Sequence, residues 1–452
     1  MSEYFFCGVC GSGMSALAQI ARLEGNSVSG SDRAFDKGEN KEVNEKLKGM
    51  GIEIYPQDGS GVKRELDFFV VSTAVEETNP DYLKAKELGM KITHRSELLS
   101  DYIKKNKTIA VGGTSGKSTT TAMIWHILKE CSMEPSIING ACINSLREMG
   151  LVGNAYKGKS EIMVIEADES DSTITNYSPE IGIILNITKD HKSIEEIKEI
   201  FLRFILNSKN IFINQDAPNC AEISKKSQNK NIIYFGKNPM KLEIDKIDFF
   251  SSEFNLNGYK FFLPLGGRHN IENAMASVAV CNFLGIDYKR ISESLKTFSG
   301  TFRRANLIGK INNISVIDDY AHNPAKIEAA LKTFLKSKRT IAIYQPHGFA
   351  PTRMFKNELI NIFSNYLKES DIIIMPEIYY AGGNVIKDIS SKDIIDELSK
   401  RGKNAYYFKN RKDILSFIRN ISLEGDIILI MGARDNTLND FAKEIYEILT
   451  QR

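Results

Sequence analysis

Short apolar runs rich in β-branched residues recur along this chain of 452 residues, and each is followed by a pattern of helical period. Such alternation of strand and helix predicts βαβ units with largely parallel sheets. Strands of a parallel sheet are buried on both faces, so they read as continuous apolar runs, as they do here. The expected strands are Tyr4–Val9, Phe68–Val71, Thr108–Val111, Ile162–Ile165, Ile181–Leu185, Ile314–Ile317, Thr340–Tyr344, Ile372–Met375 and Ile427–Met431. The chain is therefore predicted to be an α/β protein.

Two polar stretches, 104–107 and 299–304, divide this series, and each comes before a fresh strand. They predict three domains, 1–106, 107–303 and 304–452, each of an ordinary size for a domain with its own core. We expect a Rossmann-like N-terminal domain, a central phosphate-loop ATPase domain with a parallel sheet, and a Rossmann-like α/β C-terminal domain.

Charge and composition exclude several classes of protein. Lys and Arg number 59 and Asp and Glu number 57, so the net charge of +2 gives no case for nucleic acid or for an anionic membrane surface. No apolar run approaches the roughly 20 residues that span a bilayer, and Met1–Tyr4 lacks the basic start of a signal peptide. The six cysteines include one CxxC, Cys7 and Cys10, and all six are expected to be reduced. We expect a cytoplasmic protein, a monomer or weak dimer, without nucleic-acid or membrane partners.

A glycine-rich loop with a lysine lies between the expected strand Thr108–Val111 and the helical run Thr121–Leu128. Glycines let backbone N–H groups wrap a phosphate, and the helix N-terminus adds positive potential. Lys117 is expected to reach the β- and γ-phosphates, and the Ser118 hydroxyl to help hold Mg²⁺. Val111 stands where the usual phosphate loop begins with glycine, so this loop is shorter. The alternative is a glycine turn with a surface lysine.

Acidic residues follow the next expected strand. Ile162–Ile165 runs into Glu166-Ala167-Asp168-Glu169-Ser170-Asp171. Carboxylates at the carboxyl end of a parallel strand face the crevice where α/β proteins bind ligands, and their oxygens suit Mg²⁺. His191 follows Ile181–Leu185 and is a candidate metal ligand or phosphate contact, although a lone histidine there is more often structural.

The N-terminal segment Gly8–Met14 follows a strand, opens a helix and resembles a dinucleotide fingerprint with altered glycine spacing. Asp32 follows the next strand, about 20 positions on, where a ribose hydroxyl could be held. Together they favour a site for a nucleotide diphosphate. An NAD-dependent oxidoreductase is an alternative that only this loop suggests.

A third group of polar blocks lies later in the chain. Four of the six histidines, at 191, 269, 322 and 347, fall at strand or helix ends beside other polar residues, whereas His94 and His126 are expected to be structural. The blocks are Gly267-Arg268-His269-Asn270 with Asn273, Arg303-Arg304, Asp318-Asp319-Tyr320-Ala321-His322 and Gln345-Pro346-His347.

Taken in order, these blocks resemble the Mur ligase family, and within it the alanine-adding ligases, over nearly the whole chain. The resemblance implies an ATP-dependent ligase of peptidoglycan precursor synthesis. Such an enzyme joins an amino acid, expected to be L-alanine, to the carboxylate of UDP-N-acetylmuramate through an acyl phosphate. ATP and Mg²⁺ are the implied cofactors, and UDP-N-acetylmuramate and the amino acid the implied partners.

The resemblance also implies roles for single residues. For the UDP-sugar it implies Gly8, Gly11, Gly13, Met14, Ser31 and Asp32. For ATP it implies Gly113, Thr114, Ser115, Gly116, Lys117, Ser118, Thr119, Asn270, Asn273, Arg304 and Asp319. The implied catalytic residues are Lys117, Glu166 and His191, and the implied metal ligands are Ser118, Glu166 and His191. For the amino acid and substrate it leaves His322, His347, Arg353 and Arg434.

The chain departs from the alanine ligases mainly where the amino acid would bind. Ser115 and Ser118 replace His and Thr, Asn323 replaces a second histidine, Gly348 and Pro351 replace two arginines, and Arg434 and Asn436 alter a Gly-Ala-Gly-Asp-Ile segment. We therefore expect Arg434, with Arg353, to hold the amino acid's carboxylate; the alternative is that Arg434 is a surface residue. Two alternative functions remain: a Mur-type ligase for another amino acid or a recycled peptide, and a non-catalytic nucleotide-binding paralogue.

Overall fold

The computed structural model describes residues 1–189, 192–227, 231–380, 386–433, 435 and 437–451. The chain forms two compact units. The first comprises residues 1–247, 251–264 and 269–301, and the second comprises 248–250, 265–268 and 302–452. The domain boundaries expected at 106 and 303 stay predictions.

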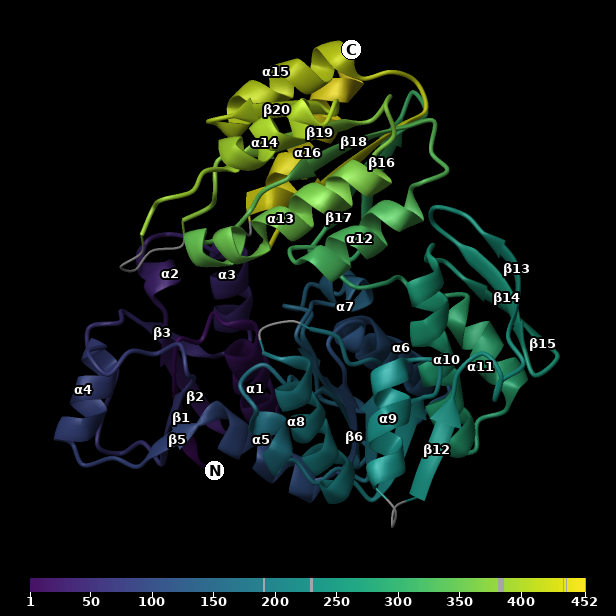
Figure 1. Cartoon of the computed structure of the whole chain (residues 1–452). Coiled ribbons are helices and arrows are strands. Elements are labelled where there is room, and N and C mark those ends of the chain that lie inside the picture. The colour runs from purple at the N-terminus through teal and green to yellow at the C-terminus, as the bar shows by residue number, and fades with distance from the viewer. Residues whose placement is uncertain (190–191, 228–230, 381–385, 434, 436, 452) are drawn as a thin grey trace. The chain divides into compact units, whose positions relative to one another are not determined.

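The first unit begins with a sheet of five parallel strands in the order β3-β2-β1-β4-β5 (Figure 1). The strands are β1 (Glu3–Cys7), β2 (Ser27–Ser31), β3 (Glu53–Tyr55), β4 (Phe68–Val71) and β5 (Ile92–His94). The helices are α1 (Ser12–Leu23), α2 (Arg33–Asp36), α3 (Lys41–Gly49), α4 (Pro80–Glu87) and α5 (Arg95–Lys105). The order reverses direction between β1 and β4, so the carboxyl end of β1 lies at a topological switch point.

The first unit continues with a seven-stranded sheet in the order β12-β11-β10-β6-β9-β7-β8, parallel except for the edge strand β8. The strands are β6 (Lys107–Gly112), β7 (Ser136–Ile138), β8 (Ala155–Tyr156), β9 (Ile162–Glu166), β10 (Ile181–Ile184), β11 (Asn210–Asn214) and β12 (Asn231–Phe235). The helices are α6 (Lys117–Glu130), α7 (Asn144–Glu148), α8 (Ile194–Asn207), α9 (Pro218–Lys226), α10 (Arg268–Phe283) and α11 (Tyr288–Leu295), with a 3-10 turn at Thr173–Asn176. β6 lies in the middle of this sheet, and its residues 109–111 are fully buried.

A small antiparallel sheet of β13 (Glu243–Ile247), β14 (Ser252–Leu256) and β15 (Tyr259–Leu263) follows. Its side chains alternate, with Phe254, Leu256, Phe261 and Leu263 buried and their neighbours toward solvent. Antiparallel sheets tolerate one solvated face, which explains this pattern. The sequence analysis did not predict this sheet.

The second unit holds a six-stranded sheet in the order β16-β17-β21-β18-β19-β20, parallel except for the β16–β17 hairpin. The strands are β16 (Asn306–Ile311), β17 (Ile314–Asp319), β18 (Arg339–Tyr344), β19 (Ile372–Pro376), β20 (Asn404–Phe408) and β21 (Asp426–Met431). The helices are α12 (Pro324–Thr333), α13 (Phe349–Tyr366), α14 (Ser391–Lys400), α15 (Arg411–Ile421) and α16 (Thr437–Thr450). One apolar core packs α12, α13 and α14 on one face of the sheet, and another packs α15 and α16 on the other.

The α/β class is confirmed, and all nine expected strands are strands of the structure. The sequence analysis did not name the remaining strands, most of them short or at a sheet edge: β3, β5, β7, β8, β11 to β16 and β20. All six cysteines are free thiols, as expected. Within the described part of the chain, no helix has the length and apolar character needed to cross a membrane.

Candidate functional site

The loop after β6 has the backbone geometry that only glycine adopts without strain. Gly113 has φ of 142° and Gly116 has φ of 86°, both in the region that favours glycine. A Cβ on Gly116 would collide with Oδ1 of Asn273, so α10 lies directly against this loop. The loop therefore leads a buried central strand into the N-terminus of α6, where backbone N–H groups have no partner within the helix.

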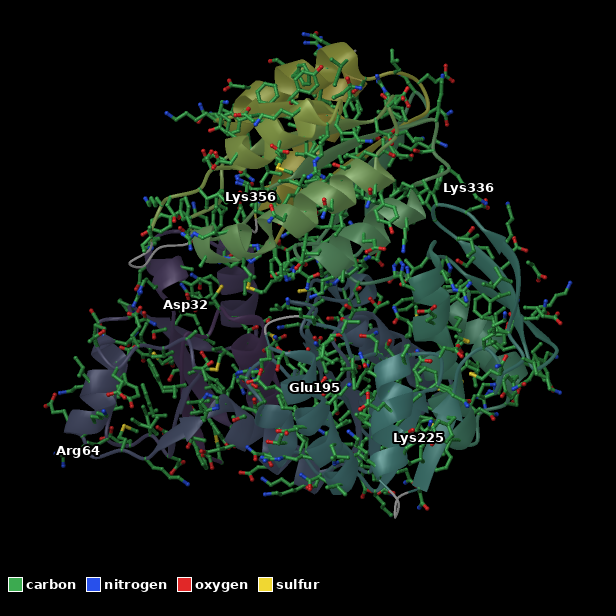
Figure 2. All side chains as sticks on the ribbon, in the orientation of Figure 1. Asp32, Arg64, Glu195, Lys225, Lys336 and Lys356 are labelled. Atoms are coloured by element: carbon green, nitrogen blue, oxygen red, sulfur yellow. The ribbon has the colours of Figure 1, made fainter. Side chains whose placement is uncertain are left out.

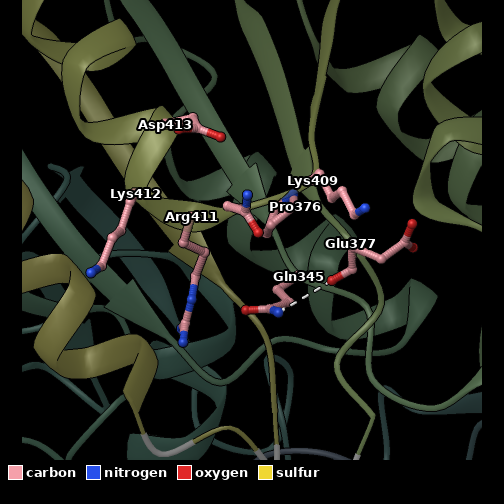
Figure 3. Close-up of a pocket in the computed structure, with 8 residues that line it drawn as sticks. Gln345, Pro376, Glu377, Lys409, Arg411, Lys412 and Asp413 are labelled. Atoms are coloured by element: carbon pink, nitrogen blue, oxygen red, sulfur yellow. Dashed lines mark hydrogen bonds between the residues drawn. The ribbon is translucent and has the colours of Figure 1, made fainter.

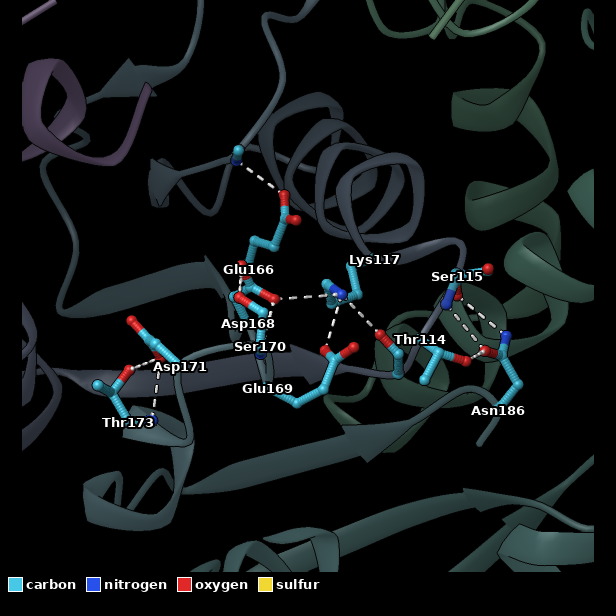
Figure 4. A network of polar contacts seen from close by, with 12 residues as sticks. Thr114, Ser115, Lys117, Glu166, Asp168, Glu169, Ser170, Asp171, Thr173 and Asn186 are labelled. Atoms are coloured by element: carbon cyan, nitrogen blue, oxygen red, sulfur yellow. Dashed lines mark hydrogen bonds and ion pairs between the residues drawn. The ribbon is translucent and has the colours of Figure 1, made fainter. Parts of the chain in front are cut away.

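Asn186, which follows the neighbouring strand β10, holds the loop in shape (Figure 4). Its Oδ1 accepts hydrogen bonds from the Thr114 hydroxyl and the Ser115 amide, each at 2.9 Å. Its Nδ2 donates to the Ser115 carbonyl at 3.0 Å. One side chain thus fixes both Thr114 and Ser115, two of the residues expected to bind ATP.

Lys117 lies in a buried acidic network and not at the surface. Its Nζ lies 2.8 Å from both the Gly113 carbonyl oxygen and Glu169 Oε2, and 3.5 Å from Asp168 Oδ1 (Figure 4). The Lys117 side chain is 12% exposed and that of Glu169 is 6%. Burial lowers the pKa of Lys117, but the carboxylates of Glu169 and Asp168 raise it above its usual value overall. The ammonium group is therefore charged at neutral pH, and the alternative of a surface lysine is wrong.

Two adjacent residues after β7 connect Ser118 with Glu166. Glu166 ends β9, and its Oε2 accepts the Gly140 amide at 2.7 Å. Asn139 Nδ2 donates to the Ser118 carbonyl at 3.2 Å. Among the described residues, no group of three or more His, Cys, Asp or Glu side chains is arranged to hold a metal ion. His191, the third implied ligand, lies outside the described residues.

Asn270 and Asn273 lie on the first turns of α10, and both are buried. Asn273 Nδ2 donates to Asn270 Oδ1 at 3.4 Å. Thr119, on α6, is also buried, and its hydroxyl lies 3.5 Å from that of Thr301. The structure therefore brings the two asparagines to the glycine loop after β6 although they are distant in sequence.

The glycine loop after β1 is closed by β2 and by Asp32, which is labelled in Figure 2. Gly8 has φ of 82°, which favours glycine. Its amide donates to the Ser31 carbonyl at 2.9 Å. The Asp32 carboxylate accepts the Cys10 amide at 2.8 Å and the Ala34 amide at 2.9 Å, so it also caps α2. Burial raises the pKa of Asp32, against the effect of these amides. The Ser31 hydroxyl donates to buried Asp81.

Arg95, which the sequence analysis did not single out, links this glycine loop to the acidic loop after β9. A Cβ on Gly13 would lie 2.7 Å from Nη1 of Arg95, so glycine makes room for the guanidinium. Arg95 Nη2 donates to Asp171 Oδ2 at 2.9 Å. The next helical residue of α1, Met14, is buried. The sequence could not predict this contact, because Arg95 is a single arginine after the short strand β5 and belongs to no motif.

In the second unit, the pair Arg303-Arg304 divides into two roles. Arg303 is 4% exposed, and its guanidinium contacts both oxygens of Asp318 and the carbonyls of Gly432 and Asp435. Both arginines lie over the ring of Tyr320, with Cζ 5.3 Å from the ring centroid for Arg303 and 5.1 Å for Arg304, but only Arg303 also holds the buried Asp318.

The adjacent carboxylates of Asp318 and Asp319 also have different partners. Asp318 is bound by Arg303 and by Asn439 Nδ2, at 2.9 Å. Asp319 accepts the backbone amides of Ala305 at 2.6 Å and Ala321 at 2.7 Å. Burial raises the pKa of Asp319, and Arg304 opposes that effect.

His322 and His347 come together at the carboxyl ends of β17 and β18, with ring centroids 5.3 Å apart. Burial lowers the pKa of His322 well below its usual value, so its imidazole is neutral. Arg353 lies on α13, where it pairs with exposed Asp388 and donates to the Ile386 carbonyl at 3.3 Å. Arg434 lies outside the described residues.

An open cavity of about 480 Å³ lies at the carboxyl ends of β18, β19 and β20, and Figure 3 shows the residues that line it. It is lined by Gln345, Pro376, Glu377, Lys409, Asn410, Arg411, Lys412 and Asp413. Gln345 belongs to one of the polar blocks singled out in the sequence, but no residue of this lining was assigned to a ligand. The cavity thus adds no support to the sites derived from the sequence.

Comparison with known families covers nearly the whole chain. Residues 3–107 match the Mur ligase family catalytic domain, 111–281 the Mur ligase middle domain, and 303–434 the glutamate ligase domain of Mur ligases. A UDP-N-acetylmuramate–L-alanine ligase of Dictyoglomus turgidum is 36% identical over 95% of this chain and 93% of its own length. The enzyme of that name from Agrobacterium fabrum is 31% identical over 96% and 94%.

Solved structures give the same result. The UDP-N-acetylmuramate-alanine ligase MurC of Thermotoga maritima superposes with a TM-score of 0.81 at 27% identity, covering 100% of both chains. The murein peptide ligase of Psychrobacter arcticus has the same fold, with a TM-score of 0.68 at 21% identity over 100% of this chain and 99% of its own. The three matched domains and the full-length relatives show that this chain belongs to the Mur ligase family of ATP-dependent ligases.

Proposed function

We propose that this protein joins L-alanine to the carboxylate of UDP-N-acetylmuramate, with ATP as the energy source, in the synthesis of peptidoglycan precursors. The observation that carries the proposal is the full-length similarity, at 31–36% identity, to relatives named for that activity. The loop around Lys117 supports it, because the glycine conformations and the buried ammonium group suit a bound triphosphate.

The proposed reaction has two steps. A carboxylate oxygen of the muramate attacks the γ-phosphorus of ATP, forming an acyl phosphate and releasing ADP. The neutral amine of alanine then attacks the acyl carbon, and the tetrahedral intermediate expels inorganic phosphate while the nitrogen loses a proton. Negative charge builds up on phosphoryl and acyl oxygens, so fixed positive groups provide most of the catalysis.

Lys117 is the residue that we assign to the γ-phosphate. In this structure its ammonium group is held by Glu169, Asp168 and the Gly113 carbonyl. A bound phosphate would take over from these acceptors, so the lysine stays charged in either arrangement.

Mg²⁺ is a further part of the proposal, and the donor atoms at this place fit it. Glu166 and Ser118 present hard oxygens at the ends of adjacent elements, and Asp168 lies nearby in the acidic loop. Bound Mg²⁺ would supply positive charge to the phosphates. Ser118 and Glu166 would hold it, with His191 as the third ligand that the family resemblance implies.

The remaining roles also stay proposals. The loop Gly8, Gly11, Gly13 and Met14 with Ser31 and Asp32 would bind the UDP-sugar, and Thr114, Ser115, Gly116 and Thr119 with Gly113 would surround the ATP phosphates. Asn270 and Asn273 are assigned to the adenine side, Arg304 to phosphate and Asp319 to the ATP ribose. His322, His347, Arg353 and Arg434 are assigned to the amino acid and substrate.

Phosphate release tests the proposal. Purified protein with ATP, Mg²⁺ and UDP-N-acetylmuramate is offered each of the twenty amino acids and several muropeptides, and the products are identified by mass spectrometry. We expect phosphate release that needs both the UDP-sugar and L-alanine, and a requirement for Mg²⁺ that rises in Glu166→Gln and His191→Ala. Phosphate release with a peptide alone would indicate a recycling ligase, and none with any acceptor would contradict the proposal.

A further inference from the structure

Asn154, just before β8, makes a buried contact with the glycine loop and α1. It is 1% exposed. Its Nδ2 donates to the Ser12 carbonyl at 2.7 Å and to the Ser15 hydroxyl at 2.9 Å, and its Oδ1 accepts from Gln19 Nε2 at 2.8 Å. Every polar atom of this side chain therefore bonds to the segment that we assign to the UDP-sugar.

The backbone of Asn154 contacts the segment after β7, which leads to the proposed ATP and metal site. Its carbonyl accepts the Asn139 amide at 2.8 Å. The Asn139 side chain donates to the Ser118 carbonyl at 3.2 Å, and the next amide, that of Gly140, donates to Glu166 at 2.7 Å. Hydrogen bonds joined through the backbone of Asn154 and of residues 139–140 therefore connect the start of α1 with the Ser118 carbonyl and the Glu166 carboxylate.

Packing alone does not require this network. Helix α1 buries Ala, Leu, Ile and Met side chains against the first unit, and Gln19 is the long polar side chain among them, at 1% exposed. A buried amide destabilises a fold unless all its polar atoms are paired, whereas an apolar side chain carries no such requirement. The arrangement therefore specifies a geometry of the glycine loop more than it adds stability.

We propose that Asn154 is a positioning residue that couples the two nucleotide sites, so that UDP-N-acetylmuramate and ATP bind with positive cooperativity. A diphosphate bound at the glycine loop orders Ser12 and the first turn of α1, and through Asn154 it orders Asn139, Ser118 and Glu166. The second ligand then meets a site that is already ordered and binds more tightly. This inference rests on the proposed function, and coupling of this kind acts equally in both directions.

Calorimetry measures the coupling directly. The affinity for UDP-N-acetylmuramate is determined with and without Mg²⁺ and a non-hydrolysable ATP analogue. We expect the wild-type protein to bind the UDP-sugar at least about fivefold more tightly when the analogue is present. In Asn154→Ala the ratio should fall below about twofold, while both ligands still bind.

Arg147→Ala is the matched control. Arg147, on α7, pairs with Glu42 of α3 at 3.0 Å, so it also connects the central sheet's elements with those of the N-terminal sheet, but away from the glycine loop. Its coupling ratio should equal that of the wild type. Should Asn154→Ala fail to fold, Gln19→Met removes one bond to Asn154 and should reduce the ratio in part.

A wild-type ratio near one, or an unchanged ratio in folded Asn154→Ala, would overturn the coupling while leaving ligation by the wild type intact. Absence of UDP-N-acetylmuramate binding to the wild type would instead remove the proposed function and this inference together. Loss of coupling in both Asn154→Ala and Arg147→Ala would also overturn it, because it would show a general effect of loosening the contact between the two sheets.

Discussion

The carboxyl ends of the central strands collect charged side chains in both units, but the charges are paired differently. After β6 and β9, Lys117 faces two carboxylates and a carbonyl oxygen. After β17 and β21, Arg303 faces one carboxylate, Asp318, and two carbonyl oxygens of its own unit.

This difference is the one we expect between the proposed ATP site around Lys117 and a structural contact around Arg303. The acceptors around Lys117 lie at a glycine loop, beside helix N–H groups that a phosphate could also use. Those around Arg303 are backbone and side-chain groups that connect β17 with the loop after β21, and no ligand could replace them without opening the fold. Charged side chains at the carboxyl ends of parallel strands can therefore serve either role. The role depends on whether a ligand can replace the groups that pair with the charge.

Removal of the Lys117 ammonium group should have the largest effect on activity. Lys117→Ala is expected to lower kcat/KM for ligation by about 10³-fold or more, because a fixed charge at the transferring phosphoryl group is lost. Thermal stability should fall as well, since buried Glu169 loses its partner. Phosphate release and thermal melting measure the two effects. Lys129→Ala, at the other end of α6 beside Trp125, is the control and should retain activity; turnover of Lys117→Ala at the control's rate would end the assignment.

Arg303 should matter chiefly for stability. Arg303→Ala is expected to destabilise the protein by about 3–5 kcal/mol, because it leaves buried Asp318 without its cation. Arg304→Ala should cost only about 0.5–1 kcal/mol, since it loses a cation–π contact with Tyr320. Urea unfolding followed by circular dichroism measures both. Equal losses in the two variants would contradict the division of roles between these arginines.

The next prediction concerns Arg434, which we propose to hold the carboxylate of the incoming amino acid. Arg434→Ala is expected to raise the KM for the amino acid about tenfold or more, because a charge-assisted hydrogen bond contributes about 1.5–3 kcal/mol. The KM for ATP should hardly change. Arg353→Ala tests the second arginine of the proposed clamp in the same assay. An unchanged amino-acid KM in both variants, or an equal rise in the KM for ATP, would leave the carboxylate to other residues.

The smallest effect concerns His126, which connects α6 with α11. Burial lowers the pKa of His126, although its Nε2 lies 2.9 Å from the Ser294 carbonyl oxygen. The folded state thus keeps the imidazole neutral while the unfolded state takes up a proton below about pH 6.5. Stability should fall as pH drops below that value, by at most about 1.4 kcal/mol per pH unit from this group. Melting curves from pH 8 to 5 should be flatter for His126→Gln; the same slope as wild type would contradict a buried neutral histidine.

The sequence by itself determined the local features: nine strands, the glycine loops and the lysine at the start of α6. Hydrophobic period, glycine conformation and helix termini depend on a few neighbouring residues, so short motifs such as 113–118 carry them. The assignment of Asn270 and Asn273 to ATP came only through resemblance to a family whose blocks occur in the same order, and it stays a prediction.

Only the tertiary structure decided which of two adjacent, chemically equal residues is structural. Arg303 and Arg304, or Asp318 and Asp319, are equivalent in a sequence, and their roles separate because Asn439 and the loop after β21 pack against one member of each pair. Asn154 likewise gave no signal, since its partners lie about 140 residues earlier. Contacts between distant segments depend on how sheets pack, and no local pattern records that packing.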